Sequence, residues 1–239
     1  MKYSLLLIAL LQVGNMSVNF NDYMPQIWNT LKAAIGNEYG VAGLMGNLYA
    51  ESGCTPYACQ PSRPYSTCMT YIGKVDRHEI SETGFVHHGC SSTGGVAQGQ
   101  GGFGLAQWTY YTRKQNLYNY WLSQGGSIGD LGMQLNYLII ELQTDFSDVW
   151  NVLVNARSVK EASDYVLHHF EKPSDQSTAV ENVREGYGID IYNQYAGTTP
   201  TPVPTPTPPP DPPNPEPQPP LKITIRHKMP IWLYPLLRR

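Results

Sequence analysis

The stretch VAGLMGNLYAESGC, residues 41–54, is the most informative part of this sequence. Its apolar residues recur at the i, i+3, i+4 and i+7 spacing of a helix with one buried stripe. They are Val41, Leu44, Met45 and Leu48. Three residues further on, Glu51 falls on the same stripe, and Gly53 is placed to end the helix. The pattern therefore predicts a carboxyl group that points toward an apolar face.

A carboxyl group in that position has its charged form disfavoured by desolvation and by the negative end of the helix dipole. We therefore expect Glu51 to hold a proton near neutral pH, as the acid of a glycosidase must. The alternative is that the helix ends before Glu51, so that its side chain lies in solvent or pairs with an arginine.

A second stretch, GQGGFGLAQWTYYTRK at residues 99–114, combines glycines with an amide and an indole. Glycine permits close approach of the backbone to a ligand, an amide can hydrogen-bond a sugar, and an indole can cover its apolar face. The candidate sugar-binding residues are Gly104, Gln107, Trp108 and Tyr110. The alternative places the glycines in a loop and Trp108 in the core.

The two ends of the chain differ from the middle. Met1 and Lys2 precede an apolar run over residues 3–11, which predicts a secretory signal peptide at 1–15, with an N-terminal core helix as the alternative. This run is too short for a membrane span. Residues 200–220 contain 13 prolines and predict an extended linker, followed by a short basic tail at 221–239.

Charge is distributed unevenly along the sequence. Residues 16–199 contain ten Lys and Arg against 17 Asp and Glu, whereas the tail contains five basic residues and no acidic one. An acidic domain argues against nucleic acid as a partner, because phosphate contacts dominate that kind of affinity.

Four cysteines predict two disulfides, since an even number in an exported chain is typical of an oxidising compartment. They are Cys54, Cys59, Cys68 and Cys90, and three pairings are open. Zinc is the rival, but the spacing offers no matched second pair, so we expect no metal.

Helical periods and end signals recur through the domain at 16–199. The predicted helices span residues 21–35, 41–52, 110–123, 131–143, 158–170 and 179–195, the fifth with an S-x-x-E capping box at Ser158 and Glu161. Residues 54–104 show no helical period and predict a small strand-and-loop lobe closed by disulfides. The expected fold class is therefore α+β, mainly helical with one small β-lobe.

Six blocks of this sequence resemble, in order, the phage tail lysozyme domain, which is related to goose-type lysozymes and lytic transglycosylases. The blocks are GLMGNLYAESG at 43–53, YIGKVD at 71–76, FVHHG at 85–89, GFGLAQWTYYTRK at 102–114, QLNYLIIEL at 134–142 and FEKPSDQSTAVENVREGY at 170–187.

The resemblance implies a lysozyme-like fold and hydrolysis of the β-1,4 glycan strand of peptidoglycan. Glu51 would be the catalytic acid, Gln107 and Trp108 would line the cleft, and Glu171 would be a structural or outer-subsite residue. Arg113 and Arg184 would form ion pairs within the fold.

The sequence departs from the resemblance at FVHHG, where His88 stands in place of an acid and an insertion covers residues 90–100. The second catalytic group is therefore open, and among the nearby carboxylates Asp76 is the candidate. The leading hypothesis is a monomeric, secreted muramidase without a cofactor, active outside the cell or in a digestive vacuole. A lytic transglycosylase and a non-catalytic peptidoglycan-binding module are the alternatives.

Overall fold

The computed structural model describes residues 18–60, 64–88 and 101–197 of the 239-residue chain. The predicted signal peptide, proline-rich linker, basic tail and the insertion with Cys90 lie outside these residues. In the part of the chain that is described, no helix has the length and apolar character needed to cross a membrane.

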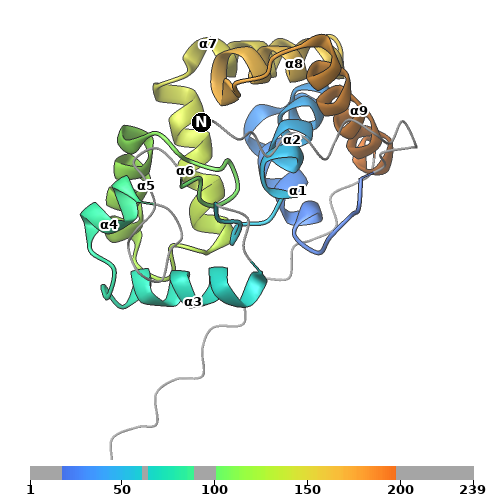
Figure 1. Cartoon of the computed structure of the whole chain (residues 1–239). Helices are drawn as coiled ribbons and strands as arrows, with labels where there is room; N and C mark the ends of the chain where they lie inside the picture. The colour runs from blue at the N-terminus through green and yellow to red at the C-terminus, as the bar shows by residue number, and fades with distance from the viewer. Residues whose placement is uncertain (1–17, 61–63, 89–100, 198–239) are drawn as a thin grey trace, which may run out of the picture. The chain divides into compact units, whose positions relative to one another are not determined.

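Two helices joined by a tight turn form the first part of the domain (Figure 1). Helix α1 (Met24–Ile35) has proline in its first turn and ends at Gly36, whose φ of 74° is left-handed. The Asn37 side chain then caps helix α2 (Glu38–Ser52) by accepting hydrogen bonds from the N–H groups of Tyr39 and Gly40. Gly53, with φ of 62°, ends α2 as predicted.

Helix α2 is the central helix of the domain and not a surface helix with one buried stripe. Every residue from Gly40 to Leu48 is buried, because α1, α7, α8 and α9 all pack on α2. The close approach depends on glycine. A Cβ at Gly43 would lie 2.5 Å from the Ala162 Cβ of α8, and one at Gly46 would lie 2.5 Å from the Arg184 carbonyl oxygen of α9.

The helices predicted after residue 109 are confirmed with small differences at their ends. They are α5 (Tyr111–Gln124), α6 (Leu131–Thr144), α8 (Val159–Val166) with the π-helical turn η2 (Leu167–Glu171), and α9 (Thr178–Tyr195). A further helix, α7 (Ser147–Asn155), lies between α6 and α8. Asp130 caps α6 through the N–H of Met133, and Ser158 caps α8 through the N–H of Glu161.

The predicted β-lobe is not found among the described residues. Helices α3 (Tyr65–Asp76) and α4 (Glu82–His87) occupy the described part of this region. Its described residues form two isolated bridges, Cys59 with Phe103 and Phe103 with Trp108. The α3 sequence does carry a helical period, since Cys68, Tyr71, Ile72 and Val75 are its buried residues. Its many Ser, Thr and Tyr residues conceal that period, because they favour helix only weakly.

The prediction of two disulfides is wrong for Cys54. The structure pairs Cys59 with Cys68, which ties the segment after α2 to α3. Cys54 is a free, fully buried thiol packed in the core, where burial raises its pKa. Within the described residues Cys54 has no disulfide partner, and it packs as a small apolar core residue.

Candidate functional site

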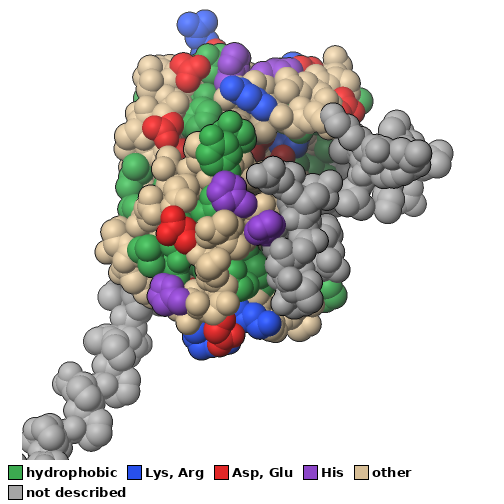
Figure 2. Space-filling view, turned by 60° about the vertical axis from the view of Figure 1, so that its left-hand side comes forward, with side chains coloured by type: hydrophobic (Ala, Val, Ile, Leu, Met, Phe, Trp, Pro, Cys, Tyr) green, Lys and Arg blue, Asp and Glu red, His purple; other side chains and the backbone are tan. Residues whose placement is uncertain are grey.

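A cleft of about 1170 Å³ opens where α2, η2 and the segment before α5 meet. Its lining residues are Glu51, Gln60, Val86, His87, Gln107, Thr109, Tyr110, Tyr111, Arg113, Phe146, Phe170, Glu171, Lys172 and Pro173. Figure 2 brings the α4 and α5 side of the molecule forward, and hydrophobic and histidine side chains gather on this face. The cleft thus combines two carboxyl groups with aromatic walls, a composition suited to a sugar polymer.

Glu51 lies in the last turn of α2 and faces the cleft, as the sequence predicts. Its side chain is 19% exposed, and its Oε1 accepts a hydrogen bond of 2.6 Å from Nη2 of Arg184 on α9. Glu51 is therefore not the isolated carboxyl group that the sequence predicts, because the alternative, an arginine partner, is present. The Oε2 atom has no hydrogen-bond partner within the described residues and stays available to a ligand.

A buried network fixes the position of this ion pair. Nη1 of Arg184 donates to Oδ1 of Asn47, whose Nδ2 donates to the carbonyl oxygens of Gly43 and Ser163. Next to Glu51, the Ser52 hydroxyl donates to the Leu105 carbonyl at 2.7 Å and so joins the end of α2 to the GFGLAQW segment. Helices α2, α8 and α9 therefore hold the Glu51 carboxylate in one orientation.

Glu171 provides the second carboxyl group of the cleft. It ends η2, after which Lys172 adopts a left-handed φ of 46° and Pro173 prevents continuation of the helix. The residue is half-buried, but its Oε1 atom is enclosed and has no hydrogen-bond partner within residues 18–60, 64–88 and 101–197. Burial and the neighbouring Glu51 charge raise the Glu171 pKa to about 8, against the opposing charges of Arg113 and Arg184.

The environment expected for Glu51 thus belongs to Glu171. Two carboxyl groups of one cleft lie in contrasting surroundings, one ion-paired and one desolvated, which is the arrangement that separates acid and base roles. The sequence placed Glu171 in the family pattern but assigned it a structural or outer-subsite role. The signal that it lies beside Glu51 is tertiary, because the two residues are 120 positions apart.

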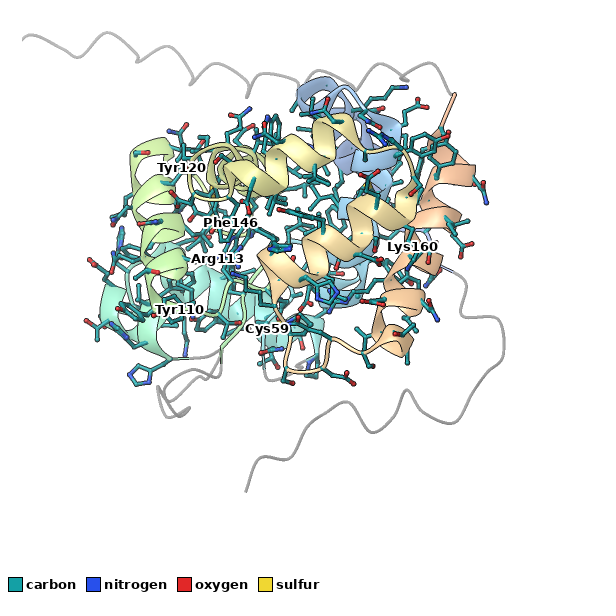
Figure 3. The ribbon with its side chains drawn as sticks, turned by 90° about the horizontal axis from the view of Figure 1, so that it is seen from above. Cys59, Tyr110, Arg113, Tyr120, Phe146 and Lys160 are labelled. Atoms are coloured by element: carbon teal, nitrogen blue, oxygen red, sulfur yellow. A yellow bond between two sulfur atoms is a disulfide. The ribbon has the colours of Figure 1, made fainter. Side chains whose placement is uncertain are left out.

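Trp108 does not line the cleft. It is fully buried, and its Nε1 donates to Oε2 of Glu141 at 2.9 Å. Arg113 binds the same carboxylate through two hydrogen bonds of 2.7 and 2.9 Å, and its guanidinium lies over the rings of Phe146 and Phe170. Figure 3 labels Arg113 and Phe146 side by side. The predicted sugar-stacking role of Trp108 is therefore corrected to a core role, which was its alternative.

Gln107 does line the cleft, but its amide nitrogen is committed to the fold. Nε2 donates to the carbonyl oxygens of Ala58 and Gly104, which holds the backbone of Gln107 at a left-handed φ of 43°. Gly104 does not line the cleft. Its φ of 72° and its contact with Gln134 are structural, since an added Cβ would lie 2.6 Å from Oε1 of Gln134.

Gln134 of α6 is a supporting residue that the sequence did not single out. Its Oε1 accepts from the Leu105 N–H, and its Nε2 donates to the carbonyl oxygens of Pro56 and Ile128. A fully buried amide with three backbone partners fixes the loop that carries Gln107.

Tyr110 lines the cleft, and its sugar-binding role stays a prediction. It is 61% exposed, and its ring lies 4.9 Å from that of Tyr111, which in turn stacks with His87 at 5.7 Å. All three side chains line the cleft. They form an aromatic shelf, defined here as His87, Tyr110 and Tyr111, against which a sugar ring can pack.

Asp76 lies outside the cleft lining, and the geometry argues against its predicted catalytic role. Its Oδ2 accepts from the Ser127 hydroxyl at 2.7 Å, and its Oδ1 accepts from the Ile128 N–H at 2.8 Å. Both oxygens therefore hold the loop before α6. Within residues 18–60, 64–88 and 101–197, no group of three or more His, Cys, Asp and Glu side chains could hold a metal ion.

Comparison with known proteins gives one family match. No curated protein and no solved structure matches the chain significantly. The family described as phage tail lysozyme matches residues 22–195, which include every helix that carries the cleft. With Glu51 at the end of a glycine-rich helix and six sequence blocks in order, this chain belongs to the phage tail lysozyme family.

Proposed function

We propose that this protein hydrolyses the β-1,4 glycan strand of bacterial peptidoglycan. The observation that carries the proposal is the pairing, in one cleft, of an ion-paired Glu51 with a desolvated Glu171, in a chain of the phage tail lysozyme family. Glycoside hydrolysis needs a carboxyl group that gives a proton and a second one that faces the developing positive charge of the sugar.

In this proposal Glu51 is an indispensable catalytic carboxyl group. Its side chain lines the cleft, its Oε2 atom has no hydrogen-bond partner among the described residues, and Arg184, itself bound to Asn47, holds its Oε1 atom. The aromatic shelf and the Oε1 atom of Gln107 would position the saccharide. No cofactor is needed for this chemistry.

Export of the enzyme is part of the proposal. The apolar N-terminal run predicts a secretory signal, and a disulfide such as Cys59–Cys68 persists in oxidising compartments. Action outside the producing cell, or in a digestive vacuole, would bring the enzyme to bacterial walls.

The test compares the wild type with Glu51→Gln on purified sacculi. We expect the wild type to release soluble muropeptides and the variant to bind sacculi while releasing at least about 100-fold less, in the range found for loss of a catalytic group. A folded wild type that binds sacculi but releases no muropeptides would contradict the hydrolase proposal and favour a non-catalytic peptidoglycan-binding module.

A lytic transglycosylase is the alternative reaction within the same cleft. It closes an anhydro ring without water, whereas hydrolysis leaves reducing ends. Mass spectrometry of the muropeptides separates these products, and we expect reducing ends.

A further inference from the structure

We propose that Lys172 sets the substrate preference of the cleft by binding a carboxylate of the peptidoglycan strand. The inference rests on the proposed glycan hydrolysis and names a group that this cleft recognises besides the sugar rings. Muramic acid carries a lactyl carboxyl group, which is either free or extended by a stem peptide that has carboxylates of its own. Chitin, a β-1,4 glycan without such groups, lacks this ligand.

The first argument is the state of the cations that line the cleft. Arg113 is bound to the Glu141 carboxylate, and its side chain is only 18% exposed. Lys172 is exposed, and its ammonium group has no ion-pair or hydrogen-bond partner within residues 18–60, 64–88 and 101–197. An ammonium group has three donors, and a carboxylate is the acceptor with which it forms its stronger hydrogen bonds. Lys172 is therefore a cation of the cleft that is open to an anionic ligand.

The second argument is the backbone at Lys172. This residue follows η2 with φ of 46° and ψ of 52°, a left-handed conformation in which glycine is the usual residue at a helix end. A lysine there strains the backbone, and in the described part of the chain no hydrogen bond or ion pair of its side chain offsets the strain. Strained residues of this kind cluster at ligand sites. The backbone thus points to a ligand independently of the charge.

The third argument is the fixed turn that carries Lys172. Pro173 restricts the backbone directly after it. Gln176 closes the turn, because its Nε2 donates to the Pro173 carbonyl at 3.1 Å and its Oε1 lies 2.9 Å from Nδ1 of His168. Nε2 of His168 in turn lies 2.8 Å from Oε1 of Glu181 on α9. A lysine on a turn that is tied to η2 and α9 loses less backbone freedom when it binds a ligand.

The fourth argument is the charge of the domain. Residues 16–199 contain ten Lys and Arg against 17 Asp and Glu, and Glu51 and Glu171 both line the cleft. This excess of negative charge disfavours the approach of an anionic strand. Lys172 places a positive charge at the cleft itself, which favours the strand where it would be cut.

The experiment uses strands with and without carboxylates. Peptide-free glycan strands offer the lactyl carboxylate, and uncross-linked strands with stem peptides offer the peptide carboxylates. Carbodiimide and methylamine convert the carboxyl groups of either substrate to neutral amides and leave the sugar backbone unchanged. The comparison therefore isolates the carboxylate and also identifies its source.

Replacement of Lys172 by Met should raise KM for a charged strand by about fivefold at low salt, the upper range for one exposed ion pair, with kcat within about twofold of the wild type. On the amidated strands the wild type and Lys172→Met should have the same KM. A rise on peptide-free strands assigns the lactyl carboxylate, and a rise confined to peptide-bearing strands assigns the stem peptide.

Three further variants separate charge from folding. Lys172→Arg keeps the charge and should keep the wild-type KM. Lys172→Gly removes the charge but suits the left-handed backbone, so it should unfold at the same or a higher temperature than the wild type and still show the raised KM. Lys160→Met removes a half-exposed cation of α8 outside the cleft lining and is the matched control, which should leave KM unchanged.

The results separate the two proposals. A folded wild type that cuts none of the strands would overturn the proposed function, and this inference with it. An active wild type whose KM is unchanged by Lys172→Met on both charged substrates would overturn the inference alone. A rise in KM of the same size on charged and amidated strands would also overturn it, because the lysine would then act through the fold and not through a carboxylate.

Discussion

The carboxylate of Glu51 and the guanidinium of Arg184 form an ion pair of 2.6 Å that joins the end of α2 to α9 across 133 positions of sequence. Arg184 is 8% exposed and also donates to Asn47, so the pair lies at the boundary between core and cleft. One interaction therefore serves both the packing of the central helix and the orientation of a candidate catalytic group.

Replacement of Arg184 by Met should destabilise the protein by about 3 kcal/mol, because it leaves the Glu51 charge and the Asn47 oxygen without a partner. Urea unfolding measures the loss. Lys160→Met is the control, since Lys160 is half exposed and its pairs with Asp164 and Glu185 should contribute less than about 1 kcal/mol. Equal losses in the two variants would contradict the buried role of Arg184.

Gly43→Ala should destabilise the protein by about 2 kcal/mol or more, because the new Cβ would lie 2.5 Å from the Cβ of Ala162 and force α2 and α8 apart. Gly186→Ala in α9 is the matched control. Its Cβ would meet no atom within 4 Å, so alanine should stabilise the helix by about 0.5–1 kcal/mol. Thermal unfolding of both variants tests whether their changes in stability have opposite signs. A Gly43→Ala variant as stable as the wild type would contradict the close approach of α2 and α8.

Trp108→Phe should lower the free energy of unfolding by about 1–3 kcal/mol, because the Glu141 carboxylate loses a buried donor. Binding to sacculi should not change. Tyr110→Ala should do the reverse, with weaker binding and stability within about 0.5 kcal/mol of the wild type, since Tyr110 is 61% exposed. If Trp108→Phe weakened binding at full stability, the indole would contact the glycan.

Asp76→Asn should keep the wild-type rate on sacculi while lowering stability by about 1–2 kcal/mol, because its two oxygens hold Ser127 and Ile128. Turnover and urea unfolding are measured on the same preparation. A folded Asp76→Asn whose rate on sacculi is about a hundredfold lower would show that Asp76 takes part in catalysis.

The Glu171 carboxyl group should make stability depend on pH. Its pKa is raised from 4.5 to about 8 by folding, so the native state binds this proton more tightly than the unfolded state does. Stability from this group is therefore greatest below about 4.5 and falls as pH rises toward about 8. Glu171→Gln should remove that fall and be more stable than the wild type at pH 8 by about 1–3 kcal/mol. Parallel stability curves of the two proteins between pH 5 and 8 would contradict the desolvated acid.

Sequence reasoning succeeded where local patterns decide the structure. Helix ends at Gly53, Asp130 and Ser158 follow from capping chemistry, and each is present. The position of Glu51 at the end of α2 follows from the helical spacing of the apolar residues before it. The family pattern was also readable, because six blocks keep their order along the chain.

Sequence reasoning failed where tertiary neighbours decide the role of a residue. Local sequence predicts that Trp108 stacks on a sugar, but its indole donates to the buried Glu141 carboxylate. Local sequence also predicts an isolated Glu51 carboxyl group, but Arg184 of α9 pairs with it. Asp76 is close in sequence to the cleft segments but is engaged by the loop before α6. These partners are 33, 133 and 51 positions away, so no local pattern contains them.

The central claim is that the cleft of Glu51 and Glu171 cuts the glycan strand itself. The most direct test incubates the purified protein with glycan strands from which an amidase has removed the peptides, and measures their chain length. The wild type should shorten these peptide-free strands and leave reducing ends, while Glu51→Gln should leave them intact. Strands that keep their length with a folded wild type would contradict the account, above all if intact sacculi lose their cross-linking peptides instead.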